Sequence, residues 1–286
     1  MQLTDPKTIQ SLLRETGFSF KKQLGQNFLT DPSVCPAMAE AAVRDCPYVL
    51  EIGPGAGVLT AELAVRAEKV VAIELDTALQ PILQKTVGGY ENVEVVYGDC
   101  MKLDLQALIA EKFGGGPVAV CANLPYYITS PVLMRLLEEQ LPIVSITVMV
   151  QKEAAERLCA PVSSRAAGAV TVAVAYRAAA EQLFQVPKES FMPSPKVDST
   201  VIRLALFKEP PVQVQDETLF FGLVRTAFMQ RRKTFVNAAS ALPGVDKQML
   251  RNALQAAGLD ENIRAEALTM QNWASIANSI REKKRG

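Results

Sequence analysis

The chain has 286 residues, of which 49% are apolar and 21% are charged, and thirty Lys and Arg residues balance thirty Asp and Glu residues. This composition supplies the core of one large or two modest globular domains, and it excludes a disordered, collagenous or coiled-coil chain. The formal net charge of zero also excludes a histone-like protein, which binds nucleic acid through its summed positive charge.

The sequence contains no histidine, which excludes Ser-His and Cys-His nucleophile pairs, a histidine base and metal sites that need histidine. Its five cysteines lie far apart without a C-x-x-C pair, so neither a zinc site nor a disulfide framework is indicated. No stretch approaches the roughly 18 apolar residues of a membrane span, and the N-terminus lacks the pattern of a signal peptide. We therefore expect a cytoplasmic protein that has no contact with membrane.

Short β-branched runs alternate with stretches of helical periodicity between residues 48 and 150, which predicts βαβ units in a parallel sheet. The predicted strands are 48–53, 70–75, 93–99, 118–126 and 144–150, followed by 169–176 and 201–207. Residues 208–213, KEPPVQ, are predicted to be a linker, and the helices after it are 219–242, 247–259 with a stop at Gly258, and 270–286. The pattern thus indicates an α/β domain over 1–207 and a small all-helical domain over 208–286.

Four polar residues end successive predicted strands: Glu51, Glu74, Asp99 and Asn123, at separations of 23, 25 and 24 positions. One βα unit has about this length, and open α/β sheets bind ligands in the crevice at the carboxyl ends of their strands. A single acid after a strand is more often a cap of the next helix. Four polar residues at nearly equal spacing favour the interpretation that their side chains line one crevice.

The segment EIGPGAG, residues 51–57, lies between a predicted strand and a predicted helix. Gly53, Gly55 and Gly57 permit a tight turn with close approach of a ligand to the backbone. The pattern is not the G-x-G-x-x-G of dinucleotide enzymes, because the third glycine comes early and Pro54 intervenes. E-x-G-x-G-x-G is typical of a loop for S-adenosylmethionine, although glycine-rich turns after strands often have a purely structural reason.

Two acids have spacings that suit such a ligand. Glu74 follows Gly53 by 21 positions, close to the offset at which an acid at the end of the second strand binds ribose hydroxyls. Asp99, one unit later, is predicted to accept a hydrogen bond from the exocyclic amine of the cofactor's adenine, with a helix cap as the alternative.

The segment NLPY, Asn123 to Tyr126, ends the fourth predicted strand and suits methylation of an aromatic amine. In that reaction the nitrogen lone pair must be turned out of conjugation toward the methyl group, which requires hydrogen-bond acceptors around the amine. The Asn123 side-chain oxygen and a backbone carbonyl near Pro125 are the predicted acceptors, and Tyr126 is predicted to stack on the base. An ordinary Asn-Pro turn with a buried tyrosine is the alternative.

Two further segments contain candidate substrate contacts. Phe191, on the proline-rich loop FMPSPKVDST, is either a second face for a base that has left its stack or a cover for the core, and Lys196 and Arg203 are predicted to be solvated or to contact phosphate. In the helical domain, Phe221, Phe228 and Phe235 recur every seven positions as an apolar stripe, into which Arg231 falls.

A buried guanidinium needs a partner, so Arg231 is predicted either to tie the helix to the catalytic domain or to bind an RNA phosphate. Arg231, Arg232 and Lys233 are, with the basic ends Lys21-Lys22 and 281–285, the candidate phosphate contacts.

With these residues in view, the sequence resembles the bacterial ribosomal RNA small-subunit adenine N6-dimethyltransferase family. The matching segments are KKQLGQNFLTD (21–31), EIGPGAGVLT (51–60), IELD (73–76), GD (98–99), NLPYYITSPV (123–132), QKEAAERL (151–158), FMPSPKVDS (191–199) and FMQRRKTF (228–235). The resemblance implies a Rossmann-like class I methyltransferase, with a seven-stranded, mostly parallel sheet containing one antiparallel strand and a small helical domain at the C-terminus. One departure is Ala167-Gly168, where the family has a Tyr-Gly pair.

The resemblance also implies roles for individual residues. In the family, the QNFL element forms a lid on the cofactor, so Asn27 and Leu29 are expected to bind S-adenosylmethionine along with Gly53, Glu74, Asp99 and Asn123. The NLPY segment is expected to hold the target adenine.

The expected function is dimethylation of N6 of two adjacent adenines in the 3′-terminal hairpin loop of 16S rRNA in the small ribosomal subunit, with a role in subunit biogenesis. The protein is expected to act as a monomer. The alternatives are an erythromycin-resistance-type methylase of large-subunit rRNA, against which the long helical region and the leucine of NLPY argue, a ribosome-assembly factor whose binding outweighs its catalysis and, more distantly, a DNA adenine methylase.

Overall fold

The structure, a computed structural model, describes residues 3–16 and 28–285, and it divides into two compact units. Unit 1 consists of residues 1–155 and 180–206, and unit 2 of residues 156–179 and 207–286. The predicted end of the first domain at residue 207 lies next to this boundary. The segment 156–179, which the prediction kept with the first domain, packs instead with the C-terminal residues.

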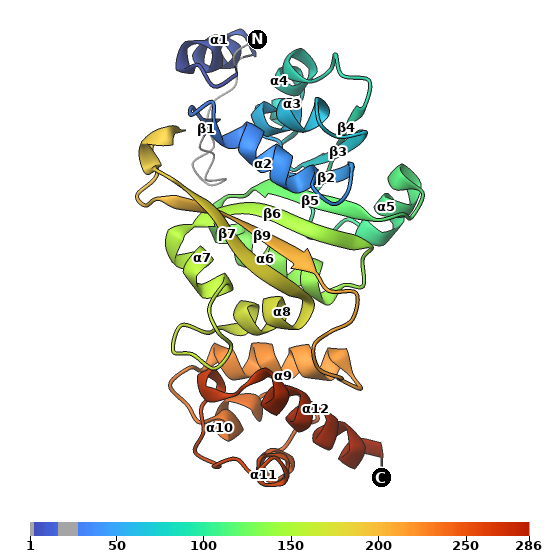
Figure 1. Cartoon of the computed structure of the whole chain (residues 1–286), viewed down its shortest axis with the longest axis vertical. Coiled ribbons are helices and arrows are strands. Elements are labelled where there is room, and N and C mark those ends of the chain that lie inside the picture. Colours follow the sequence, from blue (N-terminus) through green and yellow to red (C-terminus); the bar gives the residue numbers. More distant parts are fainter. Residues whose placement is uncertain (1–2, 17–27, 286) are drawn as a thin grey trace. The chain divides into compact units, whose positions relative to one another are not determined.

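The core of unit 1 is a seven-stranded sheet with the strand order β4-β3-β2-β5-β6-β9-β7 (Figure 1). The strands are β2 (Tyr48–Ile52), β3 (Lys69–Glu74), β4 (Val93–Tyr97), β5 (Val118–Asn123), β6 (Ile143–Gln151), β7 (Ala178–Val186) and β9 (Ser199–Leu206). The pairs among β2 to β6 are parallel, and β9 runs antiparallel to β6. The predicted class of fold, a mostly parallel sheet, is therefore confirmed.

The strand order reverses between β2 and β5, which are neighbours in the sheet although two strands separate them in the chain. Right-handed crossovers place α3 (Val58–Ala64) and α4 (Gln80–Thr86) on one face, and α5 (Leu105–Phe113) and α6 (Tyr126–Glu138) on the other. α2 (Val34–Val43) packs beside α3 and against β5 and β6 (Figure 1). The crevice at the carboxyl ends of β2 and β5 is the position where such sheets bind ligands.

The N-terminal part adds a helix and a small second sheet to unit 1. α1 (Pro6–Thr16) buries Ile9, Leu12 and Leu13. β1 (Phe28–Leu29) pairs antiparallel with β8 (Phe191–Met192), so that Leu29 lies opposite Phe191. Two segments about 160 residues apart in the chain are thereby joined beside the sheet.

Arg203 corrects one expectation, because it is neither solvated nor available to a phosphate. Its residue is 6% exposed on β9, and its guanidinium pairs with Asp45. Across the strand pair it lies opposite Thr147, which is also buried. An arginine removed from water in this way needs its carboxylate partner, so the role of Arg203 is structural.

The predicted strand 169–176 is wrong, because this segment forms the helix α8 (Ala169–Arg177). Its Val, Thr and Tyr residues favour a strand by propensity, but six of its nine residues are buried, on all sides of the helix, so packing overrides propensity. The Thr171 hydroxyl accepts from the Gly168 N–H (2.9 Å) and holds the helix start. The remaining strand of the sheet is β7, whose AAAEQ start has no strand signal.

Unit 2 is helical, but the predicted helix 219–242 is interrupted. α9 (Glu217–Met229) ends before the basic segment, and α10 (Phe235–Ala239) begins at the cap Thr234. Phe228 and Phe235 still pack together on Trp273, because the centroids of their rings lie 5.9 and 5.5 Å from the centroid of the Trp273 ring. α11 (Lys247–Ala256) ends before Gly258, whose φ is +67°, as the predicted stop requires.

The other helices are α7 (Lys152–Leu158) and α12 (Met270–Arg285). In the part of the chain that the structure describes, no helix combines the length and the apolar character needed to cross a bilayer.

Candidate active site

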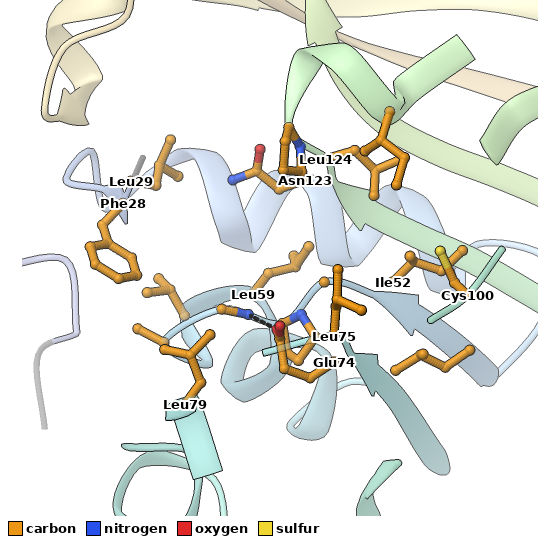
Figure 2. Close-up of a pocket in the computed structure, with 18 of the residues that line it drawn as sticks. Phe28, Leu29, Ile52, Leu59, Glu74, Leu75, Leu79, Cys100, Asn123 and Leu124 are labelled. Atoms are coloured by element: carbon orange, nitrogen blue, oxygen red, sulfur yellow. Dashed lines mark hydrogen bonds between the residues drawn. The ribbon is translucent and has the colours of Figure 1, made fainter. Parts of the chain in front are cut away.

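A pocket opens in unit 1 at the carboxyl ends of β2, β3, β4 and β5, and its walls include the loops that follow these strands. Figure 2 shows Glu74 and Asn123 on opposite sides of it, with Phe28 and Leu29 at one end and Cys100 at the other. Of the residues predicted to bind cofactor or target, those that line it are Leu29, Gly53, Glu74, Asp99, Asn123, Pro125, Tyr126 and Phe191. Asn27 lies outside the described residues.

The glycine loop has the backbone that its sequence predicts. Gly53, Gly55 and Gly57 all have positive φ values, of +74°, +58° and +85°, in which L side chains are strained. A Cβ on Gly57 would lie 2.7 Å from the Thr86 hydroxyl, whereas one on Gly53 would meet nothing within 4 Å. Gly57 therefore serves the packing of the loop, and Gly53 keeps the pocket wall open.

Glu74 joins the glycine loop to the end of β3. One carboxylate oxygen accepts the Gly55 N–H at 3.1 Å (Figure 2). The other accepts the Asp76 N–H at 2.8 Å. Burial raises the pKa of Glu74, and these two N–H donors offset part of that rise. Each carboxylate oxygen retains a lone pair, so Glu74 can accept further hydrogen bonds from a ligand in the pocket.

Asp99 is not the cap of the next helix, because α5 is capped by Asp104. One carboxylate oxygen of Asp99 accepts the Met101 N–H at 2.9 Å within the turn before α5, and Lys102 lies 3.6 Å from the other oxygen. The Asp99 side chain is 27% exposed and lines the pocket. An acceptor position is therefore open to a ligand.

The NLPY segment presents a free amide to the pocket. Asn123 ends β5, and its side chain makes no hydrogen bond to another described residue. The Pro125 carbonyl accepts the Ile128 N–H at 3.1 Å and the Thr129 hydroxyl at 3.2 Å, so both of its lone pairs serve the first turn of α6. The Leu124 carbonyl accepts no hydrogen bond from the described residues of the first turn of α6.

The ring of Tyr126 is fixed at its far end, because its hydroxyl lies 3.0 Å from the Ser199 hydroxyl at the start of β9. Phe191 is 7% exposed, packs in the core and also lines the pocket. It therefore covers the core, and its role as a second face for the target base stays a prediction.

Glu51 is the exception among the four strand-end residues. It is fully buried and does not line the pocket, because along β2 the pocket-facing residue is the next one, Ile52. Burial raises the pKa of Glu51 to about 8, the Thr60 hydroxyl lowers it only in part, and neither carboxylate oxygen has a hydrogen bond of ordinary geometry. The expectation that all four side chains line one crevice is wrong for Glu51.

Arg231 and Arg232 lie in unit 2 and are exposed, contrary to the prediction that Arg231 is buried in an apolar stripe. The chain has left the helix at Met229, so helical periodicity does not apply to them. Arg231 donates from Nη2 to the carbonyls of Arg165 (2.8 Å) and Ala167 (3.2 Å), both in unit 2. It therefore ties its own unit together, at the very segment that departs from the family pattern.

Several pocket residues were not predicted. Cys35 of α2, Leu75 and Cys100 line the pocket next to predicted residues, and Tyr127 lines it with 59% of its surface exposed. Leu75 carried a signal in the sequence, because it directly follows Glu74, a residue predicted to bind the cofactor. Cys35 carried none, since α2 precedes the glycine motif.

A glycine loop, a strand-end acid that anchors it, and an amide at the reversal point of a seven-stranded sheet together define a Rossmann-like methyltransferase. Residues 17–282 match the sequence family described as Ribosomal RNA adenine dimethylase. The chain belongs to this family.

Relatives and solved structures agree with this assignment. The chain is 44% identical over 284 residues to "Ribosomal RNA small subunit methyltransferase A" of Alkaliphilus oremlandii, and the matched residues cover 99% of both chains. It is 46% identical to the protein of that name from Geobacillus thermodenitrificans, with 97% of both chains covered. A dimethyladenosine transferase from Plasmodium falciparum has 25% identity and a TM-score of 0.70, over 90% of this chain and 98% of that one. The 23S rRNA methyltransferase ErmE has 27% identity and a TM-score of 0.63, over 89% and 99%.

Proposed function

We propose that this protein transfers methyl groups from S-adenosylmethionine to N6 of adenines in the RNA of the small ribosomal subunit, two to each base. The observation that carries the proposal is that Glu74, Asp99 and Asn123, predicted from separate strand ends, line one pocket. The names of the bacterial relatives support the small subunit as substrate. The target is two adjacent adenines of the 3′-terminal hairpin loop of 16S rRNA.

The pocket residues fit S-adenosylmethionine. A Cβ on Gly53 would project into open space, so the loop leaves room beside its backbone, and Glu74 has lone pairs for the two ribose hydroxyls. Asp99 would accept from the adenine amine, and Leu29 would cover the apolar side. When bound, the sulfonium supplies an activated methyl group, so no metal or nucleophile of the chain is needed for the transfer.

The target adenine would occupy the side of the pocket formed by the NLPY segment. The Asn123 side-chain oxygen and the Leu124 carbonyl would accept the two N–H bonds of the amine and turn its lone pair toward the methyl group. The rings of Tyr126, held by Ser199, and of Phe191 would contact the faces of the base. Catalysis rests on positioning, because the alkylated amine is acidic enough to lose its proton to water.

Unit 2 would supply contacts to RNA phosphates through Arg231 and Arg232, which are exposed. The protein would act as a monomer in the cytoplasm, where ribosomal subunits are assembled. Sedimentation of the purified protein tests the monomer, and a stable dimer would contradict it.

The decisive experiment compares both ribosomal subunits as substrates. The protein is incubated with methyl-labelled S-adenosylmethionine and with small subunits that lack this modification, or with large subunits, and the RNA is digested to nucleosides. We expect N6-dimethyladenosine from the small subunit alone. Label in the large subunit would favour the activity named for ErmE, and binding of small subunits without any label would favour an assembly factor.

A further inference from the structure

The loop between β4 and α5, residues 98–104, is folded around Asp99. The N–H groups of Lys102 and Leu103 both donate to the Asp99 carbonyl, at 2.8 and 3.0 Å. The Leu103 side chain lies over Gly98, where an added Cβ would be 2.9 Å from Leu103 Cδ1. This tight turn directs the Cys100 and Leu103 carbonyls outward, and backbone carbonyls at such a half-buried position require donors.

Both donors come from one residue of another element, Arg135 in α6. Its Nη1 donates to the Cys100 carbonyl and its Nη2 to the Leu103 carbonyl at 2.7 Å. Its Nε donates to a carboxylate oxygen of Glu139 at 2.6 Å, which compensates the charge. The side chain is 16% exposed, so these hydrogen bonds are largely shielded from water.

α6 begins at Tyr126, directly after Asn123 to Pro125, and Arg135 lies near its other end. The guanidinium therefore links the loop that contains Asp99 to the helix that begins with the NLPY segment. These are the two sides of the pocket that the proposed function assigns to the cofactor's adenine and to the target base. We propose that Arg135 is a positioning residue, which holds the Asp99 loop in its binding shape and fixes it to α6.

The geometry requires an arginine. Its planar fork reaches two carbonyls in fixed directions while a third N–H faces Glu139, and one ammonium group cannot reproduce this arrangement. The informative variants are R135Q, R135K and E139Q. The matched control is R66Q, because Arg66 also donates to a carbonyl and a carboxylate, both of Glu62, yet does not line the pocket.

The first measurement is the affinity for S-adenosylmethionine, by calorimetry, together with kcat and KM on small subunits. We expect R135Q to raise the Kd and KM for the methyl donor about tenfold, since it loses two charge-assisted hydrogen bonds. R135K should stay closer to R135Q than to the wild type, whereas E139Q and R66Q should bind as the wild type does. A purely structural role would lower the unfolding temperature without moving the KM, and that result would overturn the proposal.

The second measurement does not depend on the proposed function. Cys100 is half-buried in the same loop, so its rate of alkylation by a maleimide, followed by peptide mass spectrometry, reports whether the loop opens. We expect R135Q to raise this rate at least severalfold and R66Q to leave it unchanged, with Cys159 of unit 2 as the internal reference. An unchanged rate in R135Q overturns the proposal, whereas failure of the wild type to bind the methyl donor would contradict only the proposed function.

Discussion

Asn123 is the residue on which the proposed chemistry depends most directly. Its amide faces the pocket without a hydrogen bond to another described residue, so its removal disturbs the fold little. We expect N123A to lower kcat about a hundredfold, because the amine loses one of the acceptors that orient it. Labelled methyl transfer to small subunits measures this effect.

The control for N123A is S130A, which removes an exposed polar group from α6, the helix that follows Asn123, outside the pocket. Small-subunit binding should survive in both variants. An N123A protein with more than a third of the wild-type kcat would contradict the role of Asn123.

Glu51 makes the stability of the protein depend on pH. Burial raises its pKa to about 8, whereas in the unfolded chain the carboxyl titrates near its ordinary value of 4.5. Between these two values the folded state binds more protons than the unfolded state, so the free energy of unfolding falls as the pH rises. Above about pH 8 this decline ends.

The variant E51Q cannot titrate at this position. Its stability relative to the wild type should therefore increase between about pH 4.5 and pH 8, by roughly a few kcal/mol at most. Urea unfolding at several pH values measures the difference in the free energy of unfolding between E51Q and the wild type. The contributions of the other titrating groups are the same in both proteins and cancel in this difference. A difference that is constant with pH would show that Glu51 has an unperturbed pKa.

At the scale of elements, the glycine loop between β2 and α3 should tolerate substitution least at Gly57. An alanine there must adopt a φ of +85° and place its Cβ 2.7 Å from Thr86 Oγ1 and 2.9 Å from Val87 Cγ1. We expect G57A to lower the free energy of unfolding by about 3 kcal/mol, from backbone strain and overpacking together.

The matched control is G114A, because Gly114 has a φ of +68° but open space around its Cβ position. Only backbone strain acts at this position, so we expect G114A to lower the free energy of unfolding by about 1 kcal/mol. Equal losses in the two variants, measured by urea unfolding, would show that the contact with Thr86 does not matter.

The elements that the sequence predicted correctly are those whose local pattern and tertiary setting agree. The five parallel strands are continuous apolar runs with β-branched residues, and both faces of the sheet are covered by helices, so pattern and burial coincide. α8 and β7 were missed for the opposite reason. The Val-rich α8 is buried on all sides, and the edge strand β7 begins with alanines, so tertiary contacts decide both structures.

The site shows the same division. Strand-end spacing brought Glu74, Asp99 and Asn123 together correctly, because one βα unit has a nearly constant length. Spacing does not determine towards which face a side chain points near the end of a strand. Glu51 is the last residue but one of β2, whereas Glu74 and Asn123 are the last residues of their strands, and only Glu51 is turned away from the pocket. The contacts of Arg135 and Ser199 join segments distant in sequence, which no local pattern reveals.

At the scale of the whole molecule, the formal net charge of zero means that RNA affinity must come from local clusters. The exposed segment between α9 and α10 contains Arg231, Arg232 and Lys233, and Met229 beside it is 79% exposed. Arg231 also holds the carbonyls of Arg165 and Ala167, so its removal changes structure as well as charge. Arg232 therefore gives the cleaner test of a phosphate contact.

We expect R232Q to weaken small-subunit binding and to reduce the slope of log affinity against log salt concentration by about one, while the affinity for S-adenosylmethionine is unchanged. R231Q should show the same change in slope with an additional loss of stability of about 1 kcal/mol, because two carbonyls lose their donor. Filter binding at several salt concentrations, with calorimetry for the methyl donor, separates these effects. Binding by a variant that has lost a phosphate contact must release fewer counterions, whatever the RNA sequence. An unchanged slope in R232Q would therefore show that Arg232 does not contact a phosphate and would remove this segment from the RNA-binding surface.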